Sequence, residues 1–306
     1  MAEIAQKDRI RLHIGAHRTG TTSLQAALHR QRPNLSARGV GFWGPHAMRA
    51  GRYPGVFRWP GMGPISAEER ENIDIIVKNN TPLLEQRLKY QLDLGHRQII
   101  LSEENILGAI KVNFKLSELY PDAPLRLAVF SRVFGPYISR ISLTIRSYEA
   151  YWRSAIAFLL SEGGTLPTPR KLQALTDQPL RWLDVVKDVH TAFPNAEIFV
   201  MPFESWINNC EPHIDAIFGA ALGLPPQQYA HRNASRNQQQ LRLKLLEHGK
   251  VEAAESLGEL EAPYLPFSPA QIAQMQAVYA DDLAELQRGG LARVKLLMPE
   301  ENGYFG

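Results

Sequence analysis

The chain of 306 residues is 44% hydrophobic and 21% charged, which is typical of a globular protein with a sizeable core. It contains no run of about 18 apolar residues, so we expect no membrane span. Its polar N-terminus lacks the apolar region of a secretory signal. Cys210 is the single cysteine, which excludes an intrachain disulfide and a multi-cysteine metal site. These features together predict a cytoplasmic protein.

The net charge of +3 is too small to indicate a nucleic-acid partner, but the charge is unevenly distributed. Residues 7–58 contain ten Lys or Arg and one acid, and residues 126–153 contain five Arg and one acid. Such stretches are typical of a solvated basic face. They can also focus a field on a polyanionic ligand. The distribution alone does not decide between these two interpretations.

The N-terminal third begins with an alternating segment at 9–14, which predicts a strand. A helix is predicted at 23–28, where hydroxyl residues can cap the free N–H groups. Residues 39–64 are rich in Gly, Pro and aromatic side chains and predict a long irregular loop. A helical pattern follows at 67–94, with a predicted break near Pro82.

The rest of the chain alternates short apolar runs with helical patterns. Strands are predicted at 98–101, 127–130, 141–146 and 197–203. Helices are predicted at 149–160, 179–193 and 210–222, and one opens at Ser268-Pro269 with the inner stripe Ile272, Met275, Tyr279 and Leu286. This order predicts an α/β fold with three layers, α/β/α, around a mostly parallel sheet. We expect a single domain, residues 1–306, with a C-terminal helical part at about 237–290 packed on it.

The turn at 15–22 connects the first predicted strand to a helix and can hold an anion. Successive N–H groups of such a turn, with the first N–H groups and the dipole of the helix, converge on phosphate oxygens. Gly15 and Gly20 have the spacing of G-x-x-x-x-G-K-[ST], but Thr21 stands where that motif requires Lys. This disfavours an ATP or GTP enzyme, and Arg18 is the cation inside the turn instead. Taken alone, the turn is also compatible with a plain strand-to-helix connection.

Residues 13–25, HIGAHRTGTTSLQ, resemble the 5'-phosphosulfate loop of the sulfotransferase superfamily, in which a Lys precedes Thr-Gly-Thr-Thr. The resemblance implies a fold like that of P-loop nucleoside-triphosphate hydrolases, 3'-phosphoadenosine-5'-phosphosulfate (PAPS) as the donor, and no metal. Arg18 replaces the family's Lys; it can stabilise charge on the leaving oxygen but does not give up a proton. The implied donor-binding residues of this loop are Gly15, Ala16, Arg18, Thr19, Gly20, Thr21, Thr22 and Ser23.

Two later segments resemble parts of the family's site for the 3'-phosphate. Arg146 ends a predicted strand and Ser154 lies on the following helix; the resemblance implies that both bind one phosphate. Arg132, at the end of another predicted strand, is a rival for this role. Arg232 and Ser235 lie in a later basic loop and are candidates for contact with the 3'-phosphate or adenine. A surface Arg, a helix Ser and a solvated loop are the competing interpretations.

A base is needed because the acceptor loses its proton as it attacks sulfur. Glu103 and Glu104 follow a predicted strand, at the edge where open α/β sheets bind ligands. The family carries a Ser-Glu-Asn-like run here, so Glu104 is the expected base, Glu103 the alternative and His17 a third candidate. Two carboxylates at this place are also typical of a helix N-terminus.

These features together predict a sulfotransferase that transfers a sulfuryl group to a hydroxyl or amine of a small-molecule or carbohydrate acceptor. Aromatic side chains of the loop at 39–64 either contact the acceptor or serve in packing: Phe42, Trp43, Tyr53, Phe57 and Trp59. A non-catalytic nucleotide-binding protein on the same fold is the alternative that Arg18 keeps open, and a P-loop kinase is less favoured. We expect Arg18→Ala to lower turnover more than donor binding, and Arg146→Ala mainly to weaken donor binding.

Overall fold

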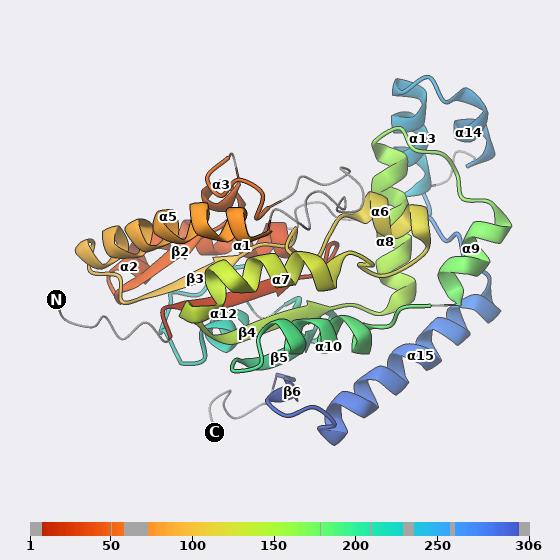
Figure 1. Cartoon of the computed structure of the whole chain (residues 1–306). Coiled ribbons are helices and arrows are strands. Elements are labelled where there is room, and N and C mark those ends of the chain that lie inside the picture. Colours follow the sequence, from red (N-terminus) through yellow and green to blue (C-terminus); the bar gives the residue numbers. More distant parts are fainter. Residues whose placement is uncertain are drawn as a thin grey trace.

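The structure is a computed structural model that describes residues 8–49, 51–57, 73–177, 179–208, 210–228, 236–257 and 261–299. Its central layer is a sheet of six parallel strands in the order β2-β3-β1-β4-β5-β6 (Figure 1). The strands are β1 (Ile10–Gly15), β2 (Val40–Trp43), β3 (Gln98–Ser102), β4 (Ile138–Ile145), β5 (Glu197–Pro202) and β6 (Val294–Leu296).

Strand β1 lies at the centre of the sheet, between β3 and β4. Leu12 pairs with Leu101 of β3 and with Ile141 of β4, and all three side chains are fully buried. Successive side chains of a strand point to opposite faces, so His13 faces the other side of the sheet. Apolar side chains such as Ile100 and Met201 also pack on that second face, as is typical of a parallel sheet covered by helices.

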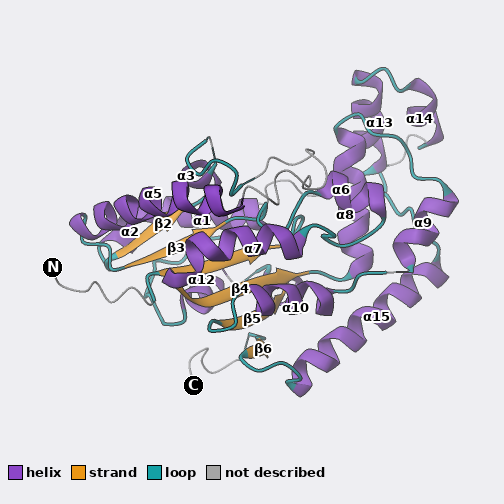
Figure 2. Cartoon of the chain, in the orientation of Figure 1, coloured by secondary structure: helices purple, strands orange, loops and turns teal. Residues whose placement is uncertain are grey.

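Helices cover both faces of this sheet and make a three-layer α/β/α fold, as the sequence predicts (Figure 2). One face packs against α5 (Ile73–Asp93), α7 (Ala123–Phe134) and α10 (Trp182–Ala192). The opposite face packs against α1 (Thr21–Arg30), α2 (Arg32–Ser36) and α12 (Cys210–Phe218). Among the helices described, none is long and apolar enough to cross a membrane.

The remaining helical elements extend from the strand ends and the sheet edge. They are α3 (Pro45–Met48), α6 (Ile110–Leu116), η1 (Gly135–Tyr137), α8 (Tyr148–Ser161), α9 (Pro169–Thr176), α11 (Phe203–Trp206), α13 (Gln238–Glu247), α14 (Val251–Ser256) and α15 (Pro269–Arg288). Leu241, Ala254 and Met275 belong to the same apolar cluster as Leu12, so the C-terminal helices share a core with the sheet. The cap of α15 is as predicted, because the Ser268 hydroxyl accepts a hydrogen bond from the backbone N–H of Gln271.

The strand predicted at 127–130 is wrong, because these residues lie inside helix α7. Leu127, Phe130 and Phe134 are buried at helical spacing and pack against the sheet. An apolar run of four residues fits a buried strand and a buried helix equally well, and the flanking residues decide. The run was too short to distinguish the two.

The irregular loop predicted at 39–64 contains more structure than expected. Residues 40–43 form β2, a fully buried strand at the sheet edge, and α3 follows it. A Cβ on Gly41 would come within 2.6 Å of the Gln91 side chain, so this glycine permits close packing of α5 on the strand. The predicted break near Pro82 is also wrong, because α5 continues through that residue.

Candidate functional site

The carboxyl ends of β1, β3 and β4 lie side by side and define the site. The chain leaving β1 leads through α1 to β2, whereas the chain leaving β4 leads to β5 on the other side of β1. The ends of β1 and β4 therefore flank a topological switch point, where open α/β sheets bind ligands. Residues 16–20 follow β1 there, and Arg146 follows β4.

The loop formed by residues 16–20 depends on the two glycines that bound it. A Cβ on Gly15 would come within 2.0 Å of the Thr21 methyl group, and one on Gly20 within 2.7 Å of the Phe203 ring. Gly20 also has φ 72 as the N-cap residue of α1, a conformation that favours glycine. Both positions therefore require glycine for the turn from strand to helix.

The backbone N–H groups of this loop divide into two sets. Ala16 donates to the Thr144 carbonyl at 3.0 Å and His17 donates to the Tyr120 hydroxyl at 2.7 Å, so both of these amides are used within the protein. In contrast, the N–H groups of Gly20 and Thr21 meet no acceptor among the described residues. An anion would therefore lie over the C-terminal half of the loop and the start of α1.

The hydroxyl residues of the loop differ in direction. The Thr19 hydroxyl donates back to the Ala16 carbonyl at 2.5 Å, and Thr19 is buried. Thr21 is also buried, with its methyl group against Gly15, and Ser23 is buried within α1. Thr22 is exposed, so its side chain is the hydroxyl that faces outward from the helix start.

Arg18 connects this loop to helix α8. It has φ 66, and its Nε donates to the Ser154 hydroxyl at 2.9 Å. Its guanidinium lies over the Phe158 ring, 5.5 Å from the ring centroid. Burial and the neighbouring cations Arg146 and Arg236 lower the pKa of Arg18 to about 10. The positive charges of Arg146 and Arg236 thus act on Arg18, an arrangement that an anion would stabilise.

Arg146 supports the same loop from the end of β4. Its guanidinium donates to the Arg18 carbonyl at 2.6 Å and lies 5.0 Å from the centroid of the Phe203 ring. Its buried Nε has no hydrogen-bond partner within the part of the chain that the structure describes. Burial lowers the pKa of Arg146, against the opposing effect of Glu204. The predicted residues Arg146 and Ser154 are therefore brought together around Arg18.

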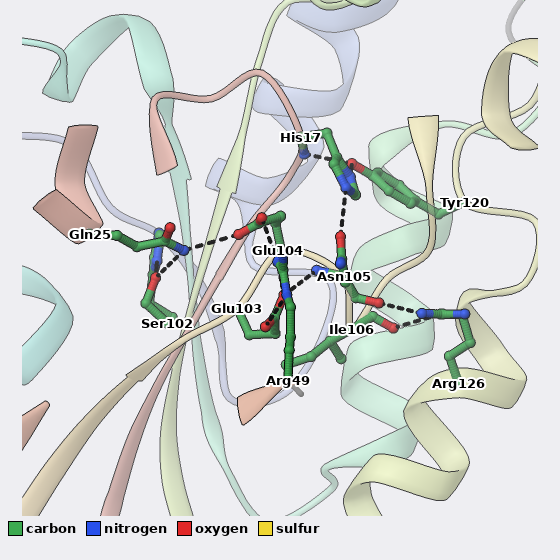
Figure 3. A network of polar contacts seen from close by, with 11 residues as sticks. His17, Gln25, Arg49, Ser102, Glu103, Glu104, Asn105, Ile106, Tyr120 and Arg126 are labelled. Carbon is green, nitrogen blue, oxygen red and sulfur yellow. Dashed lines mark hydrogen bonds and ion pairs between the residues drawn. The ribbon is translucent and has the colours of Figure 1, made fainter. Parts of the chain in front are cut away.

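Two carboxylates follow β3 on the other flank of β1, and Arg49 bridges them (Figure 3). Glu103 is fully buried and accepts two hydrogen bonds from Arg49, at 2.5 and 3.0 Å, and one from the Asn105 N–H at 2.9 Å. Burial raises the pKa of Glu103, although Arg49 opposes this effect. This carboxylate is enclosed, which argues against its predicted role as the alternative base.

Glu104 is the more accessible carboxylate, with its side chain 17% exposed. One oxygen accepts from Arg49 at 2.6 Å and the other from the Gln25 amide at 3.0 Å. Burial raises the pKa of Glu104, but Arg49, His17 and Gln25 together outweigh it and lower the pKa. Glu104 is therefore ionised at neutral pH and can accept a proton only weakly while Arg49 remains in place.

His17, the third candidate base, has both ring nitrogens hydrogen-bonded within the protein (Figure 3). Nε2 faces the Asn105 side-chain oxygen at 3.1 Å, so Nε2 carries the proton and Nδ1 accepts from the Tyr120 hydroxyl at 3.0 Å. Burial lowers its pKa, against the effect of Glu104. His17 thus fixes the loop to the segment after β3, and both of its ring nitrogens are already used within the protein.

Four residues of this network were not predicted from the sequence: Gln25, Arg49, Tyr120 and Arg126. Arg126 of α7 donates to the carbonyls of Asn105 and Ile106, at 2.5 and 3.3 Å, and so anchors the segment after β3 (Figure 3). Only Gln25 carried a sequence signal, since it lies one helical turn after Thr21. Arg49, Tyr120 and Arg126 lie far from the loop in the sequence, so the sequence alone does not show that they belong to this network.

The remaining predicted site residues have varied outcomes. Arg132 is no rival for the phosphate site, because it lies on α7, half exposed, and pairs with Asp74 at 2.7 Å. Arg232 and Ser235 lie outside the described residues, as does Trp59. Phe42, Trp43 and Tyr53 are buried, and Phe57 packs against the apolar core, so these aromatic side chains serve in packing.

Comparison with known proteins gives no assignment for this chain. Family models, curated proteins and solved structures yield no match. Within the described ranges, no group of three or more His, Cys, Asp or Glu side chains is arranged to hold a metal ion. The predictions of a metal-free site and of PAPS as the donor stay predictions.

Proposed function

We propose that the protein is a sulfotransferase that binds PAPS and transfers its sulfuryl group to an acceptor hydroxyl or amine. The acceptor is a small molecule or a carbohydrate, and a cytoplasmic location is part of the proposal. The main support is the contact of Arg146 with Arg18 beside two loop amides, those of Gly20 and Thr21, that meet no acceptor among the described residues. The charge of Arg236 adds to the positive potential at Arg18. Such an arrangement suits a ligand with several negative charges.

The donor's two anionic ends would divide between the two parts of this cationic region. The N–H groups of Gly20 and Thr21, with the dipole of α1, suit the 5'-phosphosulfate. Arg146 and Ser154 suit the 3'-phosphate, because a guanidinium fork and a hydroxyl both donate to phosphate oxygens. Arg18 lies between them, with its backbone in the loop and its side chain on Ser154. It would therefore stabilise charge on the oxygen that leaves sulfur.

In the transfer, the acceptor oxygen or nitrogen forms a bond to sulfur, and the bond between sulfur and the bridging oxygen breaks. Adenosine 3',5'-bisphosphate leaves with the electron pair of that bond, and Glu104 takes the acceptor's proton. Catalysis would come from alignment of the two substrates and from fixed positive charge at the leaving oxygen. Glu104 can play its part because it is the partly exposed carboxylate beside the loop.

The direct test is a transfer assay with PAPS that carries a labelled sulfuryl group and a panel of hydroxyl and amine acceptors. We expect label in an acceptor, and we expect Glu104→Gln to lower transfer at least 100-fold without weakening donor binding. Glu255→Gln, at an exposed position on α14, is the matched control and should leave transfer unchanged. Equal transfer by wild type and Glu104→Gln would show that Glu104 is not the base.

A non-catalytic nucleotide-binding protein is the second candidate, and one observation favours it. Glu104 is held by both Arg49 and Gln25, and its pKa is lowered, so it is a weak base as it stands. Tight binding of PAPS with no transfer to any acceptor of the panel would support this alternative. A P-loop kinase is less favoured because Thr21 occupies the position of the essential Lys.

A further inference from the structure

The short turn that carries Arg146 is held by side chains from outside it. The turn connects β4 to α8. The indole Nε1 of Trp182 donates to the Arg146 carbonyl at 2.7 Å, and the backbone N–H of Ser147 donates to Glu204 at 2.9 Å. The peptide group between Arg146 and Ser147 is therefore held at its carbonyl by Trp182 of α10 and at its N–H by Glu204 of α11.

Trp182 and Glu204 are in turn connected to the C-terminal helix α15. The Tyr279 hydroxyl donates to the second oxygen of Glu204 at 3.3 Å. The Tyr148 hydroxyl accepts from the backbone N–H of Trp182 at 2.7 Å and donates to Asp282. Tyr279 and Asp282 are three residues apart, so they lie on one face of α15. This helix packs against α8, α9 and α10 (Figure 1).

Asp282 is unusual because it is an acidic residue whose side chain is fully buried. Burial raises the pKa of this carboxyl group, although Tyr148 and Arg181 oppose the effect. Arg181 is its cationic partner, at 2.6 Å. Apolar side chains of similar volume often stabilise a protein as well as a buried ion pair does, so packing alone does not account for Asp282. The hydrogen bond that it accepts from the Tyr148 hydroxyl holds Tyr148 in one orientation.

We propose that Asp282 and Tyr279 of α15 are positioning residues for Arg146, which makes the C-terminal helix a structural part of the anion site. Asp282 acts through Tyr148 and Trp182 on the Arg146 carbonyl, and Tyr279 acts through Glu204 on the N–H of the same peptide group, that of Ser147. Neither residue touches the ligand. This inference rests on the proposed function, because it assigns Arg146 to the 3'-phosphate of the donor.

The test is the dissociation constant of adenosine 3',5'-bisphosphate, measured by calorimetry for wild type, Asp282→Asn and Tyr279→Phe. Each variant should bind about 5- to 10-fold more weakly, and the KM for PAPS should rise with little change in kcat. Asp281→Asn is the matched control, since Asp281 is the exposed neighbour on the same helix and should bind like wild type. Tyr279→Phe loses a single hydroxyl group, so it keeps the test valid if Asp282→Asn does not fold.

A double-mutant cycle separates positioning from general destabilisation. In the Arg146→Ala background, Asp282→Asn and Tyr279→Phe should cause no further loss of affinity, because the residue they position is gone. The inference is wrong if wild type binds the bisphosphate but the variants bind equally well, or if their loss persists without Arg146. Absence of binding by wild type would instead overturn the proposed function.

Discussion

The two flanks of strand β1 carry opposite charge arrangements. On the β4 flank, Arg18 and Arg146 lie close together, and Arg236 adds to their mutual repulsion. On the β3 flank, Glu103 and Glu104 share the cation Arg49. We call these the cation flank and the carboxylate flank. The cation flank gains stability from an added anion, whereas on the carboxylate flank Arg49 already offsets one of the two negative charges.

This difference indicates that the two flanks would have different roles, one in donor binding and the other in proton transfer. An anionic donor suits the cation flank, where positive charge is concentrated at the switch point. The carboxylate flank would receive the acceptor's proton, but only to the extent that Arg49 leaves Glu104 basic. Binding and proton transfer would thus depend on different residues, and substitutions on each flank should have separable effects.

The largest expected effect is on the carboxylate flank, from Arg49→Gln. Removal of the cation leaves Glu103 buried without its charge partner, so the free energy of unfolding should fall by about 3–5 kcal/mol. Denaturant unfolding at pH 7 measures this loss. Arg49→Lys keeps the charge and should recover part of it. A loss below about 1 kcal/mol for Arg49→Gln would show that the ion pair is not important for stability.

The same substitution should change the pH dependence of activity. Without Arg49, the pKa of Glu104 rises, so the acidic limb of the kcat/KM profile should shift to higher pH. Donor affinity should stay within about 2-fold, because Arg49 lies on the other flank. An unshifted limb would remove Glu104 from the role of base.

On the cation flank, Arg18→Ala should lower kcat by about 100- to 1000-fold, since it removes positive charge at the leaving oxygen. Arg146→Ala should instead weaken the binding of adenosine 3',5'-bisphosphate by about 10- to 100-fold with a smaller change in kcat. Arg18→Lys restores a cation and should recover most of the turnover. The two assigned roles are wrong if the effects of the alanine variants are reversed.

The two flanks meet above a buried polar layer that contains two neutral histidines. His13 lies between the hydroxyls of Ser102 and Thr144, and burial lowers its pKa to about 4. Burial, and the nearby His13, lower the pKa of His213 to about 3. Both imidazoles have an ordinary pKa of 6.5 in the unfolded chain, which therefore binds more protons below that pH.

Stability should therefore fall as the pH falls below 6.5. From pH 7.5 to 5.5 we expect the free energy of unfolding to decrease by about 2–3 kcal/mol for the two histidines together. Urea unfolding at several pH values measures this change. His13→Gln removes one titrating group and should reduce the pH-dependent part by about half. A stability that is flat across this range would show that the histidines are not held neutral.

The smallest expected effect comes from the loop itself. Gly15→Ala places a methyl group against Thr21, so the loop must shift, and adenosine 3',5'-bisphosphate should bind about 10-fold more weakly. Thr21→Ser removes the opposing methyl group and should restore binding in the Gly15→Ala background. Thr21→Ser alone is the control and should bind like wild type. The loop geometry is wrong if the double variant binds no better than Gly15→Ala.

Local patterns predicted most of the fold but only part of the site. Alternation and helical spacing located β1, β3, β4, β5 and α15, because each pattern lies within one short segment. The run at 127–130 was misassigned, since four apolar residues fit a buried helix as well as a strand. Arg18, Arg146 and Glu104 were singled out from turn and strand-end positions and from the family resemblance, and they lie at the ends of β1, β4 and β3. Arg49 and Tyr120 were not, because only tertiary packing brings them to the strand ends.

The most direct test of the cation flank is a calorimetric titration of the wild-type protein with adenosine 3',5'-bisphosphate and, separately, with ATP and Mg²⁺. We predict that the bisphosphate binds at least 10-fold more tightly, and that its affinity falls as salt is raised, since charge drives the binding. Tighter binding of ATP, or no binding of the bisphosphate at low salt, would contradict the account.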